Sequence, residues 1–412
     1  MAFNGEIYEI MSWLPAKPLY KLTTIAKSSM EFLSETPFVE KQCRNSSSRT
    51  EESLIIQEDS SLRERVKNLK FCFLHENRSY NGIPKKSIKF LARKGRIIAS
   101  SNGLVLCRTI DSNKPTELFL CNPVTRTWLP IKLPSKKLAK FFRENGVIKV
   151  VFLCGNFFGV PKKFPLDYTL LFFTLHDDDD WNSGYDVFLF EEGGWIRVQE
   201  NLRFEGGGDL SFDEQVCCKD GLYFLSESLS PYVFHYDVKN GTSRTLPLPL
   251  EKHREGGENE GSNLGYFRLF GWEKKEGDVW FESICLVKCL DMVITIWVLE
   301  NNTGHTGHTG TTTTKEKKTS SWSRVFTIHM EDDLGIKKST WTNSFTILGK
   351  DLIFANSDGL IFRYCLQGKN RGNLDMICNY GYSCSTKLRF NSFSTTLRPC
   401  LKNLIKKPFK IK

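Results

Sequence analysis

The chain has 412 residues, of which 40% are hydrophobic and 13% aromatic, and its formal net charge is +10. This composition supports a large buried core and excludes wholesale disorder. The 31 phenylalanines and 9 tryptophans favour β-sheet, because stiff, flat side chains suit a half-buried pleated surface. The sequence begins without a basic region followed by an apolar stretch, so we expect no secretory signal peptide.

The most apolar run, from Ile284 to Leu299, contains Lys288 and Asp291 and is too short to cross a bilayer. We interpret it as a buried strand and expect no membrane association. The 13 cysteines include no C-x-x-C pair, so reduced core thiols are expected rather than a disulfide framework. These features predict a protein of the cytoplasm, the nucleus or both.

The first predicted elements are three short helices within residues 1–42. Ile7, Ile10, Met11 and Leu14 have the i, i+3, i+4, i+7 spacing of one helical stripe, and Pro15 ends that helix. A second helix is expected from about residue 18 and a third from about residue 28. Helices this short cannot bury their apolar stripes alone, so the module needs a partner.

Three stretches of this module form a recognisable order: EIMSWLPAKPL at 9–19, IAKS at 25–28 and TPFV at 36–39. Together they resemble an F-box. More narrowly, the chain is similar to plant F-box proteins with a C-terminal F-box-associated, kelch-like domain. In that family the F-box binds the Skp adaptor of an SCF ubiquitin ligase, and through it the cullin. The C-terminal body captures the protein that is to be ubiquitinated.

The resemblance implies which residues face the adaptor. They are Ile7, Ile10, Leu14, Pro15, Leu19 and Ile25. The chain departs from the family at two places: Ala2 and Phe3 stand where a Leu-Pro pair is usual, and Ser29 stands where Trp is usual. Both lost groups are apolar, which predicts weaker adaptor binding.

Residues 43–87 are predicted to be a linker. The sequence is polar at 45–52 (NSSSRTEE) and at 58–61 (EDSS), which is typical of a flexible or semi-ordered connection. Only the apolar triplet at 54–56 is expected to dock locally.

Residues 88–400 show short strands separated by turns. Ser101-Asn102-Gly103 predicts a turn, and similar turn-plus-strand units begin at residues 219, 350 and 358. Trp128, Trp195 and Trp322 each begin a Trp-x-x-aliphatic unit. Repeats of this kind are typical of propeller blades of about 40–50 residues, here about six or seven. Their order also resembles the F-box-associated domain. The predicted fold is therefore mainly β: a small α-helical F-box module, then a β-propeller-like body, then a basic tail at 401–412.

We predict no catalytic, cofactor-binding or metal-binding site. The glycines at 206–208 lack the Lys-Ser/Thr of a phosphate-binding loop. His176 and the four aspartates that follow are interpreted as a solvated hairpin tip, because adjacent carboxylates repel one another. His305 and His308 lie in a low-complexity insertion at 301–320, interpreted as a mobile loop. The basic tail is accompanied by no nucleic-acid-binding fingerprint.

Three functions compete. The first is a non-catalytic substrate receptor of an SCF-type ligase with an unidentified target protein. The second is an interaction scaffold whose degenerate F-box recruits no ligase, and the third is an enzyme or carbohydrate-binding propeller. Co-purification of a Skp adaptor and cullin would separate the first two, and a pocket of perturbed carboxylates or histidines would favour the third. In another interpretation the helices only cap the chain's own sheet.

Overall fold

The computed structural model describes much of the chain. The described residues are 5–22, 32–33, 35–47, 53–58, 69–73, 89–92, 95–109, 117–133, 149–154, 168–175, 184–191, 194–203, 209–218, 221–228, 230–249, 266–276, 279–301, 320–367, 371–381, 387–394 and 396–400. The chain forms two compact units. One consists of Met1–Arg203 with Thr342–Lys412, and the other of Phe204–Trp341. The insertion at 302–319 and the basic tail lie outside the described residues.

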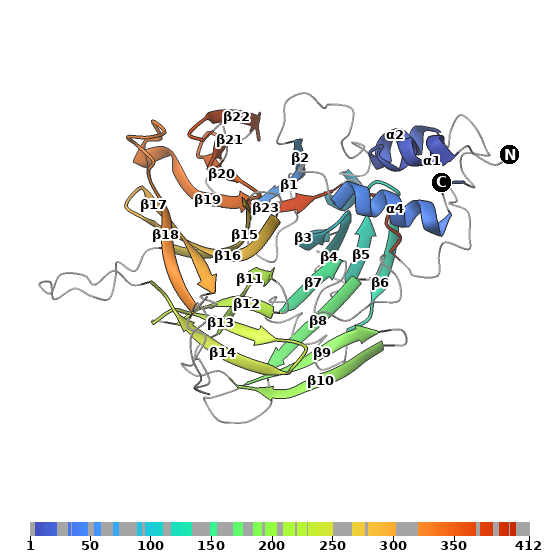
Figure 1. The fold of residues 1–412 in the computed structure, drawn as a ribbon, viewed down its shortest axis with the longest axis horizontal. Helices are drawn as coiled ribbons and strands as arrows, with labels where there is room; N and C mark the ends of the chain where they lie inside the picture. The colour runs from blue at the N-terminus through green and yellow to red at the C-terminus, as the bar shows by residue number, and fades with distance from the viewer. Residues whose placement is uncertain are drawn as a thin grey trace, which may run out of the picture. The chain divides into compact units, whose positions relative to one another are not determined.

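The fold is mainly β, as the sequence predicts. The described residues form six sheets, five of four strands and one of three (Figure 1). Each four-stranded sheet is built from four consecutive strands in spatial order, which is the arrangement of a propeller blade. The β-propeller-like class is confirmed, with six blades.

The first unit contains the three-stranded sheet and three of the four-stranded sheets. The three-stranded sheet has the order β2 (Leu69–Phe73), β1 (Ser53–Glu58) and β23 (Leu388–Phe393). The four-stranded sheets are β3 (Gly95–Ser101), β4 (Leu104–Thr109), β5 (Leu118–Asn122) and β6 (Thr127–Ile131); β7 (Val150–Cys154), β8 (Tyr168–Leu175), β9 (Tyr185–Glu191) and β10 (Gly194–Leu202); and β19 (Trp341–Leu348), β20 (Asp351–Asn356), β21 (Leu360–Cys365) and β22 (Leu374–Asn379).

The second unit contains two sheets. They are β11 (Leu210–Cys218), β12 (Gly221–Ser226), β13 (Tyr232–Asp237) and β14 (Thr242–Pro247), and β15 (Tyr266–Glu276), β16 (Val279–Leu290), β17 (Val293–Asn301) and β18 (Ser320–His329). A short 3₁₀ helix, η1 (Lys338–Thr340), precedes β19. The central strand β12 is buried along its whole length, whereas the outermost strand β14 is largely exposed. A strand covered on both faces is continuously apolar, which explains the sequence GLYFLS.

Local turn chemistry defines the hairpins. Asn102 and Gly103 both have positive φ, at 38° and 83°, and connect the paired residues Ser101 and Leu104. A two-residue turn of this kind matches the twist of the flanking strands, so the predicted turn is confirmed. Asp291 and Met292 also have positive φ. They divide the apolar run 284–299 between β16 and β17, so the expectation of one buried strand was wrong.

The recurring tryptophans lie on outermost strands. Trp128 is in β6, Trp195 in β10 and Trp322 in β18. The indole N–H of Trp195 donates to the carbonyl oxygen of Lys132, just after β6, at 2.5 Å. In the second unit the indole of Trp322 donates in the same way to the carbonyl oxygen of Pro247, at the end of β14, at 2.9 Å. Each bond joins the outer strands of two successive sheets, which gives this sequence motif a physical role.

The three-stranded sheet combines two strands from the N-terminal part of the chain with one from the C-terminal part. β1 pairs antiparallel with β2 on one side and with β23 on the other, from Ser53↔Phe393 to Glu58↔Leu388. Both β1 and β2 lie within 43–87, the segment that the sequence analysis treats as a linker. The apolar triplet at 54–56 explains the difference, because Ile55 belongs to one hydrophobic cluster and Leu54 and Ile56 to another, on the opposite face.

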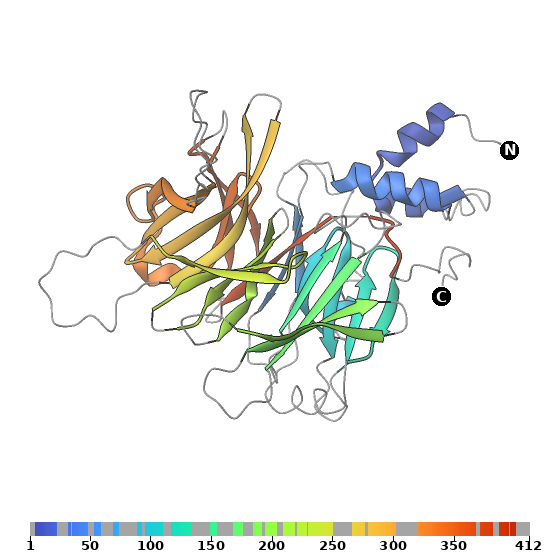
Figure 2. The same cartoon turned by 60° about the horizontal axis from the view of Figure 1, so that its bottom comes forward.

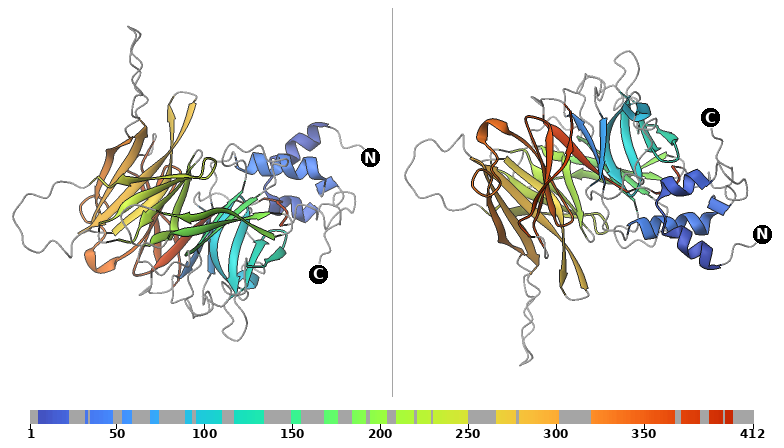
Figure 3. Two further views of the ribbon diagram at one scale, coloured as in Figure 1. Left: turned by 90° about the horizontal axis from the view of Figure 1, so that it is seen from below. Right: turned by 90° about the horizontal axis from the view of Figure 1, so that it is seen from above.

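Helices α1 (Gly5–Ser12), α2 (Ala16–Leu22) and α4 (Thr36–Ser47) lie together beside the sheet of β3–β6 (Figures 2 and 3). Leu19 and Phe38 from the helices share one hydrophobic cluster with Val105 of β4, Phe119 of β5 and Phe393 of β23. The helical module is therefore continuous with the core of the first unit.

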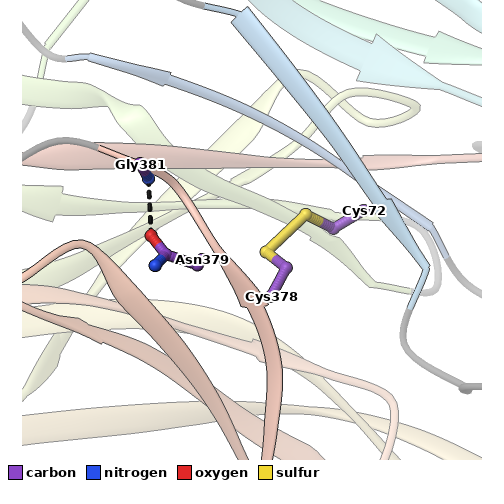
Figure 4. The surroundings of a disulfide bond; sticks show 4 residues. All are labelled: Cys72, Cys378, Asn379 and Gly381. Carbon is purple, nitrogen blue, oxygen red and sulfur yellow. Dashed lines mark hydrogen bonds between the residues drawn. A yellow bond between two sulfur atoms is a disulfide. The ribbon is translucent and has the colours of Figure 1, made fainter.

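Cysteines follow the sequence expectation with one exception. Cys72 of β2 and Cys378 of β22 form a disulfide with 6.8 Å between their Cα atoms (Figure 4). The other ten cysteines in the described ranges form no disulfide, and nine of them are buried. The prediction of reduced core thiols therefore fails for this pair, whose residues lie 306 positions apart in the sequence.

Candidate protein-binding surface

The inner face of α1 packs on aromatic side chains. The ring of Tyr8 meets Phe32 and Phe38 edge-on, with centroids 5.3 and 5.4 Å apart. Met11, one turn further along, is buried in the same cluster. Edge-to-face pairs add to the apolar burial of these rings, so this face fixes the rotation of α1 about its axis.

Polar contacts between α1 and α4 support this orientation. The amide nitrogen Nδ2 of Asn45 donates to Oγ of Ser12 at 2.8 Å, and that hydroxyl donates to the carbonyl oxygen of Glu9 at 2.7 Å. The Glu9 carboxylate forms an ion pair with Lys41. The hydrogen bond from Lys41, followed by that from Trp13, lowers the pKa of Glu9. The ion pair is exposed and contributes little to stability, but it aligns the two helices.

Three apolar side chains are exposed on α1 and in the turn that follows it. Ile7 is 45% exposed, Ile10 65% and Trp13 45%. Ile7 and Ile10 lie three residues apart on neighbouring turns of α1, on nearly the same face, and Trp13 follows directly after the helix. The Trp13 indole donates to Oε1 of Glu9 at 3.0 Å, which orients its ring. We call Ile7, Ile10 and Trp13 the outer line.

The six residues that the resemblance assigns to the adaptor differ in their exposure to solvent. Ile7 and Ile10 are exposed on the outer line, whereas Leu14 and Pro15 are half-buried in the turn before α2. Leu19 is fully buried in the core of the first unit. Ile25 lies outside the described residues. The surface available to a partner thus contains two of the six, and the role of all six stays a prediction.

Trp13 was missed by the sequence analysis. The signal was present, because position 13 continues the spacing of 7 and 10. The i, i+3, i+4, i+7 template instead grouped Ile7 and Ile10 with Met11 and Leu14, which face the core. A helix with apolar residues on two faces does not reveal from its period which face is inward.

Gln42 of α4 connects this helix to the turn before α2 and to the C-terminal segment. It is fully buried. Its Nε2 atom donates to the carbonyl oxygen of Leu14 at 3.3 Å and to Oγ of Ser46 at 2.9 Å. Its Oε1 atom accepts the backbone N–H of Leu397 at 3.0 Å. One side chain thus ties α4 to the turn below the outer line and to the C-terminal segment.

That C-terminal segment, residues 396–400, is itself anchored on the sheet of β3–β6. Asn122 donates from Nδ2 to the carbonyl oxygens of Thr396 and Arg398, at 3.0 and 2.8 Å. The hydroxyl of Thr396 donates to the carbonyl oxygen of Asn102 at 3.2 Å. The segment is almost entirely buried although it forms no strand. Through Gln42 and residues 396–400, the helical module that contains the outer line is therefore anchored to the sheet of β3–β6.

The possible metal ligands and the cysteine thiols of the described residues bear on catalytic chemistry. Within them, no group of three or more His, Cys, Asp or Glu side chains is placed to hold a metal ion. Burial raises the pKa of the thiols of Cys43, Cys289 and Cys400 to about 11, so they are poor nucleophiles at neutral pH. His176, His305 and His308 lie outside the described residues. No helix that the structure describes is long and apolar enough to cross a lipid bilayer.

Comparison with known proteins finds a relative by sequence similarity. The chain is 25% identical over 249 residues to an F-box protein of Arabidopsis thaliana, covering 60% of this chain and 64% of that protein. The chain thus spans less than two thirds of this relative's length. No protein-family model matches the sequence.

Solved structures resemble the chain only weakly. The acylaminoacyl peptidase of Pyrococcus horikoshii has a TM-score of 0.33 and 10% identity, covering 80% of this chain and 41% of that one. The WD40 domain of SCAP from fission yeast has a TM-score of 0.24 and 10% identity, covering 71% and 73%. Neither likeness bears on the function of this chain.

Proposed function

We propose that the chain is a substrate-recognition subunit of an SCF-type E3 ubiquitin ligase. In this proposal the outer line of α1 binds a Skp-type adaptor, which connects the chain to a cullin, and the β body binds the protein to be ubiquitinated. The chain itself is not an enzyme, and it acts by holding its target near the ubiquitin donor. The assembly would operate in the cytoplasm, the nucleus or both.

One observation carries the proposal: α1 and the turn after it expose three large apolar side chains, while the opposite face of α1 packs on the core. Such side chains on a fixed helix are suited to fill pockets of a protein partner, and aromatic residues are enriched among the anchors of such interfaces. The similarity to a plant F-box protein supports the Skp-type adaptor as that partner.

The position of Leu19 bears on the alternatives. Because it is buried in the core of the first unit, the helices do cap the chain's own sheets. The cap and the binding surface use different faces of the module, since Tyr8 and Met11 face inward and Ile10 faces outward. The two interpretations are therefore compatible.

The experiment that tests the proposal is quantitative adaptor binding by the full chain. Ile10→Asp places a carboxylate on the most exposed residue of the outer line, and Trp13→Ala removes the aromatic ring. Loss of a central anchor costs about 2 kcal/mol or more, so we expect roughly 30-fold weaker binding of a purified plant Skp adaptor for each variant.

Ile196→Asp is the matched control, because Ile196 on β10 is also an isoleucine with an exposed side chain, at 50%. It should bind the adaptor as the wild type does. If the wild type binds no Skp adaptor, the chain is an interaction scaffold and not a ligase subunit. If Ile10→Asp folds and binds normally, the outer line is not the contact surface.

A further inference from the structure

The disulfide joins two strands that the chain forms far apart in sequence. Cys72 lies on β2, at the edge of the three-stranded sheet, where β2 has β1 as its partner strand. Cys378 lies near the end of β22, the outermost strand of its sheet. In Figure 4 the two sulfur atoms bridge these strands, close to the turn in which Asn379 accepts the N–H of Gly381 at 2.7 Å.

The two faces of β2 belong to different cores. Cys72 belongs to the cluster that contains Leu54 of β1 and Ile353 and Ile361 from the sheet of β19–β22. On the opposite face, Phe71 packs against the cluster that contains the helical module, and its ring lies edge-on to Phe393 at 6.1 Å. A bond on one face of β2 therefore holds in place the strand whose other face supports the helices.

One sulfur of the pair is more accessible than the thiols of the core. Cys72 is 5% exposed and Cys378 is half-buried, so solvent reaches the pair from the Cys378 side. By contrast, Cys107 and Cys285 are fully buried, and burial raises the pKa of each thiol far above its ordinary value. A thiol–disulfide exchange reagent can thus reach Cys378 while such core thiols stay protected.

We propose that Cys72 and Cys378 form a reversible redox clasp, which couples the thiol–disulfide state of the surroundings to the stability of the helical module. The oxidant would be a small disulfide such as oxidised glutathione. The Cys378 thiolate attacks one of its sulfurs and releases one glutathione thiolate. The Cys72 thiolate then attacks the mixed disulfide at the Cys378 sulfur and releases the second.

Two protons leave the cysteines and two glutathione thiolates receive them, so two electrons pass from the protein to the glutathione disulfide. Reduction by excess glutathione reverses both steps. The clasp goes beyond the proposed ligase function and does not rest on it, because it concerns the packing of β2 and the helices in any functional context.

The test uses the full chain equilibrated with oxidised or with reduced glutathione. Mass spectrometry of unreduced peptides measures the Cys72–Cys378 bond, and hydrogen exchange measures protection of the amides in β2, α1 and α4. We expect the bond to form in oxidised glutathione and exchange in these three elements to become about tenfold or more faster on reduction, since opening of a local unit follows its local stability.

Two variants complete the test. Cys378→Ser should show the fast exchange in both buffers. Cys217→Ser should behave as the wild type, because Cys217 is also half-buried but forms no disulfide and lies on β11 in the second unit. The wild-type comparison stands even if Cys378→Ser fails to fold. Free thiols at both positions in oxidised glutathione would overturn the clasp. A bond that forms without changing exchange in α1 and α4 would overturn its coupling to the helices. No adaptor is needed, so either failure is distinct from failure of the ligase proposal.

Discussion

Gln42 offers the sharpest test of how the helical module is held. Gln42→Leu keeps the approximate volume of the side chain and removes three hydrogen bonds, to Leu14, Ser46 and Leu397. Each bond contributes about 1 kcal/mol net. The buried N–H of Leu397 would also lose its acceptor, Oε1 of Gln42, and leaving such a group unpaired costs about 1–3 kcal/mol. Because the three bonds share one side chain and are not additive, we expect a total loss of about 2–4 kcal/mol in the free energy of unfolding.

The assay is urea unfolding of the full chain followed by far-UV circular dichroism, with hydrogen exchange to locate the effect. Arg44→Leu is the control, because Arg44 is exposed on the same helix and its replacement should change stability by about 0.5 kcal/mol or less. Exchange should rise in α4 and at residues 396–400 for Gln42→Leu alone. Equal unfolding midpoints for the two variants would refute the view that Gln42 anchors the module.

Two further predictions concern the body. Gly103→Ala should destabilise the chain by about 2 kcal/mol or more, because φ at Gly103 is +83° and an added Cβ would overlap the Thr396 side chain. Gly372→Ala, with φ of +88° and open space around it, should lose only about 1 kcal/mol. Equal losses in urea unfolding would show that the C-terminal segment does not pack there. The second prediction is a pH dependence. Burial, followed by repulsion from Arg244, lowers the pKa of His235 from 6.5 to about 4. Because the folded state disfavours the protonated imidazole, its stabilising contribution is present above pH 6.5 and is lost as the pH falls toward 4. The urea unfolding midpoint of His235→Gln should therefore fall less between pH 6.5 and 4 than that of the wild type. An equal fall in the two proteins would contradict a lowered pKa at His235.

Features set by short stretches of sequence were predicted well. The Asn102-Gly103 turn follows from residues that tolerate positive φ. The repeat of Trp-x-x-aliphatic units identified Trp195 and Trp322, which occupy equivalent places on outer strands. Both signals are local, so one sequence suffices to detect them.

Features that depend on distant residues were not predicted. Nothing in residues 53–58 indicates that their partner is β23, more than 300 positions away. The residues before and after this strand are polar, and their composition predicts a linker. The Cys72–Cys378 bond has the same character, since spacing along the chain carries no information about two strands that only the complete fold brings together.

The candidate surface shows the same division between local and distant information. The sequence correctly places Ile7 and Ile10 on a helix, but which helical face is outward depends on Phe38, Phe393 and the sheets beneath. This has a practical consequence for testing the proposed function. A substitution at Leu19 would open a cavity in a shared core and cost about 2–5 kcal/mol of stability. Loss of adaptor binding in such a variant would report unfolding of the module. Only changes on the outer line, at Ile7, Ile10 and Trp13, alter the surface while leaving the support of α1 intact. They alone can separate recognition from folding in this part of the chain.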